Sequence, residues 1–201
     1  MIKNLLATSA ILLTLGLNAP VVLADDHCDE GTLGAILGSF GPGFDSDQND
    51  FDIVREAVAL FPPLVDAACD ADAELTVFLP TDKAFRILLE DLGVGSFKNE
   101  EELFNEIALL LGAGGVFEVL TYHLVEGVLT SGIVVAAGDG YEVETLNGES
   151  FELDFRGKKQ IRLKDGAPDL RDPIVRIVDI EAVNGVAHVI DRVLLPPPAE
   201  D

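Results

Sequence analysis

The spacing of hydrophobic residues changes partway along the chain. Between residues 51 and 61, apolar side chains recur every three or four positions, which predicts a helix that ends at Pro62-Pro63. Beyond Gly127, apolar and polar residues alternate, most clearly over residues 151–155, which predicts half-buried strands. Helices in the first half and strands in the second indicate an α+β fold with an antiparallel sheet.

The same two periods predict the remaining elements. Residues 25–49 are rich in Gly and Asp and predict an irregular N-terminal segment with one short helix around residues 33–37. We expect helices over residues 82–92, 99–112 and 116–124, and strands over residues 75–79, 141–146 and 161–163.

Polar residues that can cap a helix precede the first two long helices. Asn49 or Asp50 is placed to cap the helix over residues 51–61, and Thr81 or Asp82 is placed to cap the next one. Their side chains are short enough to accept hydrogen bonds from the free N–H groups of a first turn.

Two Asn-Gly pairs lie between runs of β-forming residues. Asn147-Gly148 separates the predicted strands over 141–146 and 151–155, and Asn184-Gly185 follows the β-rich run over 174–183. Both residue types tolerate the positive φ of a type I′ turn, so we expect a hairpin at each pair.

The N-terminus has the composition of a secretory signal peptide. Lys3 precedes an apolar stretch over residues 5–17, and the small-residue pattern Val22-Leu23-Ala24 follows. The apolar stretch is too short for a membrane-spanning helix, so we expect no transmembrane anchor. Residues 1–24 are therefore interpreted as a signal peptide, and the protein as secreted or periplasmic.

The net charge is −23, with 36 acidic and 13 basic residues. Such a charge repels nucleic acid and anionic lipid, so neither is an expected partner. Two interpretations of the excess remain open, namely solubility and attraction of cations or basic partners.

The chain contains two cysteines, Cys28 and Cys69. An even number of cysteines in an exported protein predicts one disulfide, with two free thiols as the alternative. A loop of about 41 residues would stabilise the fold by roughly 4 kcal/mol on the chain-entropy account.

The sequence offers little for catalysis. Two of its three histidines, His123 and His188, lie among apolar residues, where a hydrogen-bonded core role is more common than a catalytic one. No Gly-x-Ser-x-Gly motif occurs. We therefore expect a protein that is not an enzyme and that needs no cofactor.

One acidic segment has the spacing of a calcium-binding loop. Asp45, Asp47, Asn49 and Glu56 occupy positions 1, 3, 5 and 12 of an EF-hand-like loop. The sixth position lacks the required Gly, and a helix is predicted to begin too early for that loop. The segment is a weak calcium candidate, and a solvated cluster that caps the helix is the favoured interpretation.

Four motifs resemble the signatures of the fasciclin (FAS1) domain family, and they occur in family order. Residues 75–85, Leu-Thr-Val-Phe-Leu-Pro-Thr-Asp-Lys-Ala-Phe, resemble the first signature, and residues 183–196 resemble the second. Residues 120–124 resemble the Tyr-His segment, and residues 145–148 resemble the Thr-Leu-Asn-Gly corner. The resemblance covers residues 50–196, followed by a C-terminal tail over 197–201.

The resemblance implies a FAS1-like wedge-shaped β-sandwich with several α-helices packed along one edge. It also implies a non-enzymatic module that mediates cell-surface or extracellular-matrix adhesion by binding a protein or glycan. Tyr122 and His123 correspond to the candidate contact segment of the family, with a buried structural role as the alternative. The sequence leaves the oligomeric state open.

A periplasmic small-ligand carrier is the competing hypothesis. It would bind its ligand in a cleft between helices and sandwich, and it predicts a deep apolar pocket. A structure without a concavity above a few hundred Å³ would argue against it.

Overall fold

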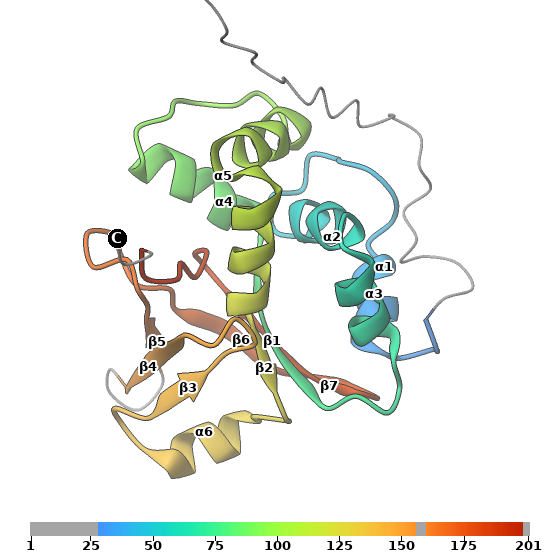
Figure 1. Cartoon of the computed structure of the whole chain (residues 1–201), viewed down its shortest axis with the longest axis vertical. Helices are drawn as coiled ribbons and strands as arrows, with labels where there is room; N and C mark the ends of the chain where they lie inside the picture. The colour runs from blue at the N-terminus through green and yellow to red at the C-terminus, as the bar shows by residue number, and fades with distance from the viewer. Residues whose placement is uncertain (1–27, 156–159, 199–201) are drawn as a thin grey trace, which may run out of the picture.

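The computed structural model describes residues 28–155 and 160–198 (Figure 1). The predicted signal peptide and residues 199–201 of the C-terminal tail lie outside the described residues. The fold contains two β-sheets and several helices, which confirms the α+β class. In chain order its elements are α1 (Leu33–Gly38), α2 (Asp52–Ala59), α3 (Pro62–Cys69), β1 (Leu75–Pro80), α4 (Asp82–Asp91), α5 (Glu100–Tyr122), β2 (Leu124–Glu126), α6 (Ser131–Ala137), β3 (Glu142–Glu144), β4 (Ser150–Phe155), β5 (Ile161–Lys164), β6 (Val175–Ala182) and β7 (Gly185–Ile190).

The first sheet has four strands in the order β2-β1-β7-β6. Strands β1 and β7 run parallel, with Leu75 opposite Gly185 and Pro80 opposite Ile190, whereas the other two pairings are antiparallel. The expectation of a wholly antiparallel sheet is therefore wrong at its centre. Parallel strands need a crossover, and the helices α4 to α6 together with the second sheet supply it here.

The second sheet is antiparallel, in the order β3-β4-β5. Val143 lies opposite Phe151 across the corner that contains Asn147-Gly148, and Leu153 lies opposite Leu163. The alternation of the sequence is seen at Val143, Phe151, Leu153 and Leu163, which are buried, but it breaks at the end of β4, where Asp154 is buried and Phe155 only partly so.

The central strands β1 and β7 are covered on both faces. Phe78 of β1 packs with Phe151 and Leu153 of the second sheet, while its neighbour Leu79 packs with α2, α4 and α5. Figure 1 shows α2, α4 and α5 toward one end of the central strands, and α6 at the opposite end beside the second sheet. Every residue of β7 is buried, as a strand between two cores requires.

Three elements were not predicted from the sequence. Pro62-Pro63 was expected only to end a helix, but these prolines open α3, where a missing N–H costs nothing. Helix α6 and the short strand β2 also lie where we expected neither. Short elements have too few residues to establish a period.

Helix α5 consists of two helical halves joined at Gly112. That residue has φ 63° and ψ 174°, so the first half ends where the sequence predicted. The Asn99 side chain caps the first turn by accepting from the Glu102 N–H at 2.8 Å. Among the described residues, α5 is the one helix whose length and composition would allow it to cross a membrane, yet the break at Gly112 interrupts it and both halves bury residues in the core.

The hairpin between β6 and β7 differs from the expected one by a single residue. Ala182 pairs with Gly185, so Val183 and Asn184 form the turn. Among the described residues other than glycine, only Asp179 has a positive φ, so the predicted type I′ geometry at Asn184 is wrong. Gly185 is required for close packing instead, because a Cβ there would lie 1.9 Å from the Leu75 carbonyl oxygen.

Candidate functional site

Tyr122 and His123 lie inside the protein. Their exposed fractions are 0% and 5%, respectively. The Tyr122 hydroxyl donates to the Ser150 carbonyl at 3.0 Å, which ties the end of α5 to the second sheet. Burial raises the pKa of Tyr122 above its usual value, so the phenol stays neutral. Because both side chains are buried, a partner at the surface would not contact them in this structure.

His123 caps the C-terminus of α5 and joins it to the end of the chain. Its Nδ1–H donates to the Val119 carbonyl at 2.7 Å, and its Nε2 accepts from the Leu194 N–H at 3.0 Å. Burial lowers the pKa of His123 to about 4, so the ring is neutral at pH 7. Both ring nitrogens are engaged with backbone groups, which is the arrangement of a structural histidine.

His188 has a similar arrangement beside a serine and an aspartate. Its Nδ1 accepts from the Asp179 N–H at 3.2 Å, and its Nε2–H donates to the Leu129 carbonyl at 2.8 Å. The Ser131 hydroxyl donates to the Asp179 carboxylate, not to the histidine. Nucleophilic catalysis requires a histidine nitrogen that is free to take the serine proton. Both ring nitrogens of His188 are engaged with backbone groups, so Ser131, His188 and Asp179 lie close together without forming a catalytic triad.

The four residues of the predicted calcium loop do not converge. Asp45 accepts from the Asp47 N–H at 2.6 Å, and Asp47 accepts from the Asn49 N–H at 3.0 Å, which makes successive local turns. Glu56 lies on α2 and pairs with Arg55 at 3.2 Å. Only Asp45 belongs to a group of carboxylates close enough to share an ion.

A different set of carboxylates meets where α2, α4 and α5 begin. Oxygens of Asp45, Asp52 and Glu100 lie within 4.8 Å of one another, as do those of Asp50, Asp82 and Glu100. Asp52, Asp82 and Glu100 are at most 2% exposed. These residues form the acidic cluster, and they are the described side chains best placed to hold a cation or to share protons.

Hydrogen bonds explain why the acidic cluster forms. The Asp82 carboxylate accepts from the N–H groups of Asp52 and Ile53 at 3.2 and 3.0 Å, so it caps α2 from 30 residues away. Neither Asn49 nor Asp50 caps that helix, whose N-cap residue is Phe51. Sequence reasoning placed Asp82 at the start of α4 alone, and no local pattern points to the second helix.

Burial and crowding keep part of the acidic cluster protonated. Burial, followed by the hydrogen bond with Asp50, raises the pKa of Asp82 to about 9. Burial and the neighbouring carboxylates likewise raise the pKa of Glu100 to about 7. The Arg55 guanidinium, which is 0% exposed, pairs with Asp52 and supplies the positive charge of the cluster.

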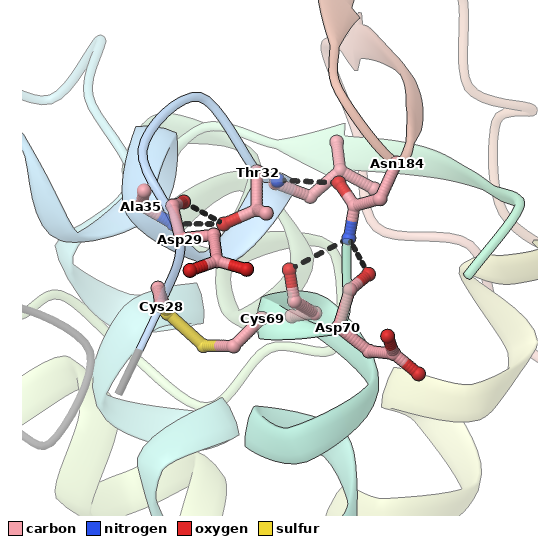
Figure 2. The surroundings of a disulfide bond; sticks show 9 residues. Cys28, Asp29, Thr32, Ala35, Cys69, Asp70 and Asn184 are labelled. Carbon is pink, nitrogen blue, oxygen red and sulfur yellow. Dashed lines mark hydrogen bonds between the residues drawn. A yellow bond between two sulfur atoms is a disulfide. The ribbon is translucent and has the colours of Figure 1, made fainter. Parts of the chain in front are cut away.

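The predicted disulfide between Cys28 and Cys69 is present (Figure 2). It joins the segment before α1 to the last residue of α3. Gly34 of α1 packs against both sulfurs, because a Cβ there would lie 2.7 Å from Cys69 Sγ and 2.8 Å from Cys28 Sγ. The bond therefore fixes α1 on α3.

Asn184 completes this junction from the opposite end of the sequence. Its Oδ1 accepts from the Leu33 N–H at 2.8 Å, and its Nδ2 donates to the carbonyls of Ala68 and Asp70, both at 2.9 Å. Figure 2 shows the amide group between these segments. Sequence reasoning assigned Asn184 to a turn and missed this role, for which its 1% exposure is the structural sign.

One apolar cavity lies between the helices and the central sheet. Its volume is about 60 Å³. That is well below the few hundred Å³ expected of a carrier that encloses a whole small ligand. A hollow of about 270 Å³ beside Val65 and Cys69 is open and partly polar, unlike the deep apolar pocket that the hypothesis predicts.

Comparisons with known proteins agree on one family. The Fasciclin domain family matches residues 56–196. Protein sll1483 of Synechocystis sp. is 32% identical over 134 residues, which cover 65% of this chain and 59% of that protein. Transforming growth factor-beta-induced protein ig-h3 of Sus scrofa is 26% identical over 153 residues, which cover 76% of this chain and 19% of that protein. The chain thus spans less than two thirds of the length of either relative.

A solved structure shows the same fold. It is a FAS1 domain pair from the insect cell adhesion molecule fasciclin I, with a TM-score of 0.53 and 19% sequence identity. The match covers 75% of this chain and 48% of the other.

Proposed function

The chain belongs to the fasciclin family, and on this premise we propose that it is a non-enzymatic module that mediates contact with the cell surface or extracellular matrix. Its partner would be a protein or a glycan. The observation that carries the proposal is the Fasciclin domain over residues 56–196. The relationship to the insect cell adhesion molecule supports the fold alone, and the adhesive role is the step we add.

The chemistry of the described side chains supports a binding role over catalysis. In both His123 and His188, the two ring nitrogens form hydrogen bonds with backbone groups. In this proposal Tyr122 and His123 hold the fold rather than touch the partner, because a contact surface must be accessible. The contact then falls on other, exposed parts of the domain.

Charge narrows the class of partner. A net charge of −23 favours cationic protein surfaces or neutral glycans over acidic ones. The signal peptide predicted over residues 1–24 supports a secreted or periplasmic location, and the Cys28–Cys69 disulfide is consistent with an oxidising compartment.

The test is adhesion by the purified protein. Beads coated with it should bind host cells, matrix proteins or a glycan array. Polyglutamate of comparable charge should not abolish this binding, which separates specific adhesion from attraction by net charge alone. Binding through a cationic partner should weaken as salt rises from 50 to 500 mM, whereas glycan binding should persist. A protein that bound none of the three surfaces would contradict the proposal.

A further inference from the structure

The apolar cavity is walled by three helices and floored by the central sheet. Helix α2 contributes Ile53 and Ala57, both halves of α5 contribute Ile107 and Val119, and β1 contributes Leu79. His123 is the only titratable residue in the lining, and its two ring nitrogens already bond to Val119 and Leu194. A ligand in the cavity would therefore meet hydrocarbon on all sides.

Water is not expected to fill this apolar cavity. A buried water needs about 10–15 Å³ and two to four polar partners, so 60 Å³ offers ample room but no partners. Apolar cavities of similar character stay dry and take up apolar solutes instead. The volume suits a short hydrocarbon segment, not a whole lipid.

The cavity reaches the surface at the kink of α5. Leu60 and Leu111 belong to its lining and are 37% and 40% exposed. The preceding Leu110 is 49% exposed, so the surface beside the mouth is also apolar. Exposed apolar residues that continue into an apolar cavity mark a binding site more strongly than scattered ones.

The kink also gives the mouth room to adjust. Gly112 lies directly after the exposed leucines and takes a φ of 63°, which favours glycine. A Cβ at Gly112 or Gly114 would meet nothing within 4 Å, so the space beside these two residues is open. The two halves of α5 that wall the cavity are joined through these glycines.

We propose that the cavity binds the end of an unbranched hydrocarbon chain, which enters between Leu60 and Leu111 and leaves a neutral head group in water. The lining selects hydrocarbon because it offers no free polar group, and the volume admits only the chain end. The net charge of −23 disfavours an anionic head. The occupant is a single amphiphile, not a bilayer surface, and the site is independent of the proposed adhesive contact.

Alkyl maltosides of increasing chain length, each below its micelle concentration, provide the test. Calorimetric titration of the purified protein should show affinity rising about fourfold per added methylene and levelling off once the cavity is full. Excess maltose should not displace the maltoside. Equal affinity for all chain lengths, or loss of maltoside binding in excess maltose, would overturn the proposal.

Two variants locate the site. Ala57→Leu fills the cavity and should weaken binding of the longest maltoside at least tenfold, with thermal unfolding measured to verify the fold. Leu111→Ser changes a partly exposed lining residue at the mouth and should weaken binding several-fold even if Ala57→Leu does not fold. Ile133→Ser is the matched control, because Ile133 is 50% exposed on α6, which lies away from the helical end of the molecule in Figure 1.

Neutral phosphatidylcholine vesicles distinguish the two sources of a hydrocarbon chain. The proposal expects no flotation with vesicles beyond that of the Leu111→Ser variant. Flotation that depends on Leu110 and Leu111, without any binding of single maltoside molecules, would assign the leucines to a bilayer surface and overturn the proposal.

Discussion

The backbone N–H of Leu194 donates a hydrogen bond to Nε2 of His123 over 3.0 Å, across 71 residues of sequence. On its other side the ring donates to Val119 within α5. His123 thus connects the end of a helix to the segment that follows β7, and it does so as a neutral ring.

Replacement of His123 by Ala should lower the free energy of unfolding by about 2–5 kcal/mol, because it leaves the Leu194 N–H and the Val119 carbonyl without partners inside the core. The variant should also change how the free energy of unfolding depends on acidic pH, because the neutral His123 ring contributes to it. The folded pKa of about 4 lies below the ordinary value of 6.5, so this contribution is lost as pH falls from 6.5 toward 4. Urea unfolding at pH 7 and pH 5 should show a smaller pH-dependent loss in the variant than in the wild type. An unchanged loss would contradict the assignment.

Asp82 should have the opposite effect of pH. Its folded pKa of about 9 lies above the ordinary value of 3.8, so its contribution is present at low pH and is lost as pH rises toward 9. Asp82→Asn keeps an oxygen to cap α2 and removes the proton equilibrium. The variant should lose less stability between pH 5 and pH 9 than the wild type, as measured by urea unfolding. An identical slope would show that Asp82 does not share protons with the acidic cluster.

Asn184 offers a test of turn chemistry against tertiary bonding. Aspartate serves in turns about as well as asparagine, so a residue that only shaped the turn would tolerate Asn184→Asp within about 0.5 kcal/mol. In the observed junction a carboxylate would face the carbonyls of Ala68 and Asp70, which now accept from Nδ2. We expect Asn184→Asp to destabilise by about 2–4 kcal/mol, at least as much as Asn184→Ala. Chemical denaturation of the two variants makes the comparison.

Gly185 should not accept a methyl group. The Cβ of Gly185→Ala would lie 1.9 Å from the Leu75 carbonyl oxygen, so strands β1 and β7 would have to separate at their first pair. We expect a loss of about 3 kcal/mol or more, or failure to fold. Gly132→Ala on α6 is the control: its nearest neighbour would be Thr130 Oγ1 at 3.8 Å, so the variant should fold with stability equal to or above the wild type. Thermal unfolding of both variants decides, and equal Tm values would refute the close approach.

The amino-acid sequence predicted some of these features well and others poorly. Long helices and strands were predicted because each has enough residues to reveal a period, as Phe85 and Leu89 do in α4 and Phe151 and Leu153 do in β4. The Cys28–Cys69 pairing could be predicted because the sequence contains no other cysteine, and the structure confirms it. Capping was predicted less well, since Asn99 caps its own helix but Asp82 caps a helix that begins 30 residues earlier.

The sequence by itself determined the fold class, the family and the positions of the long elements, because spacing and turn residues act between neighbours a few positions apart. Only the tertiary structure decided that β1 runs parallel to β7, that Tyr122 and His123 are enclosed, and that Asn184 bonds to the α1 and α3 segments. The same holds for the acidic cluster and the apolar cavity, each assembled from several elements. These features depend on which distant segments meet, and a side chain carries no local pattern that identifies a partner 71 or 151 residues away.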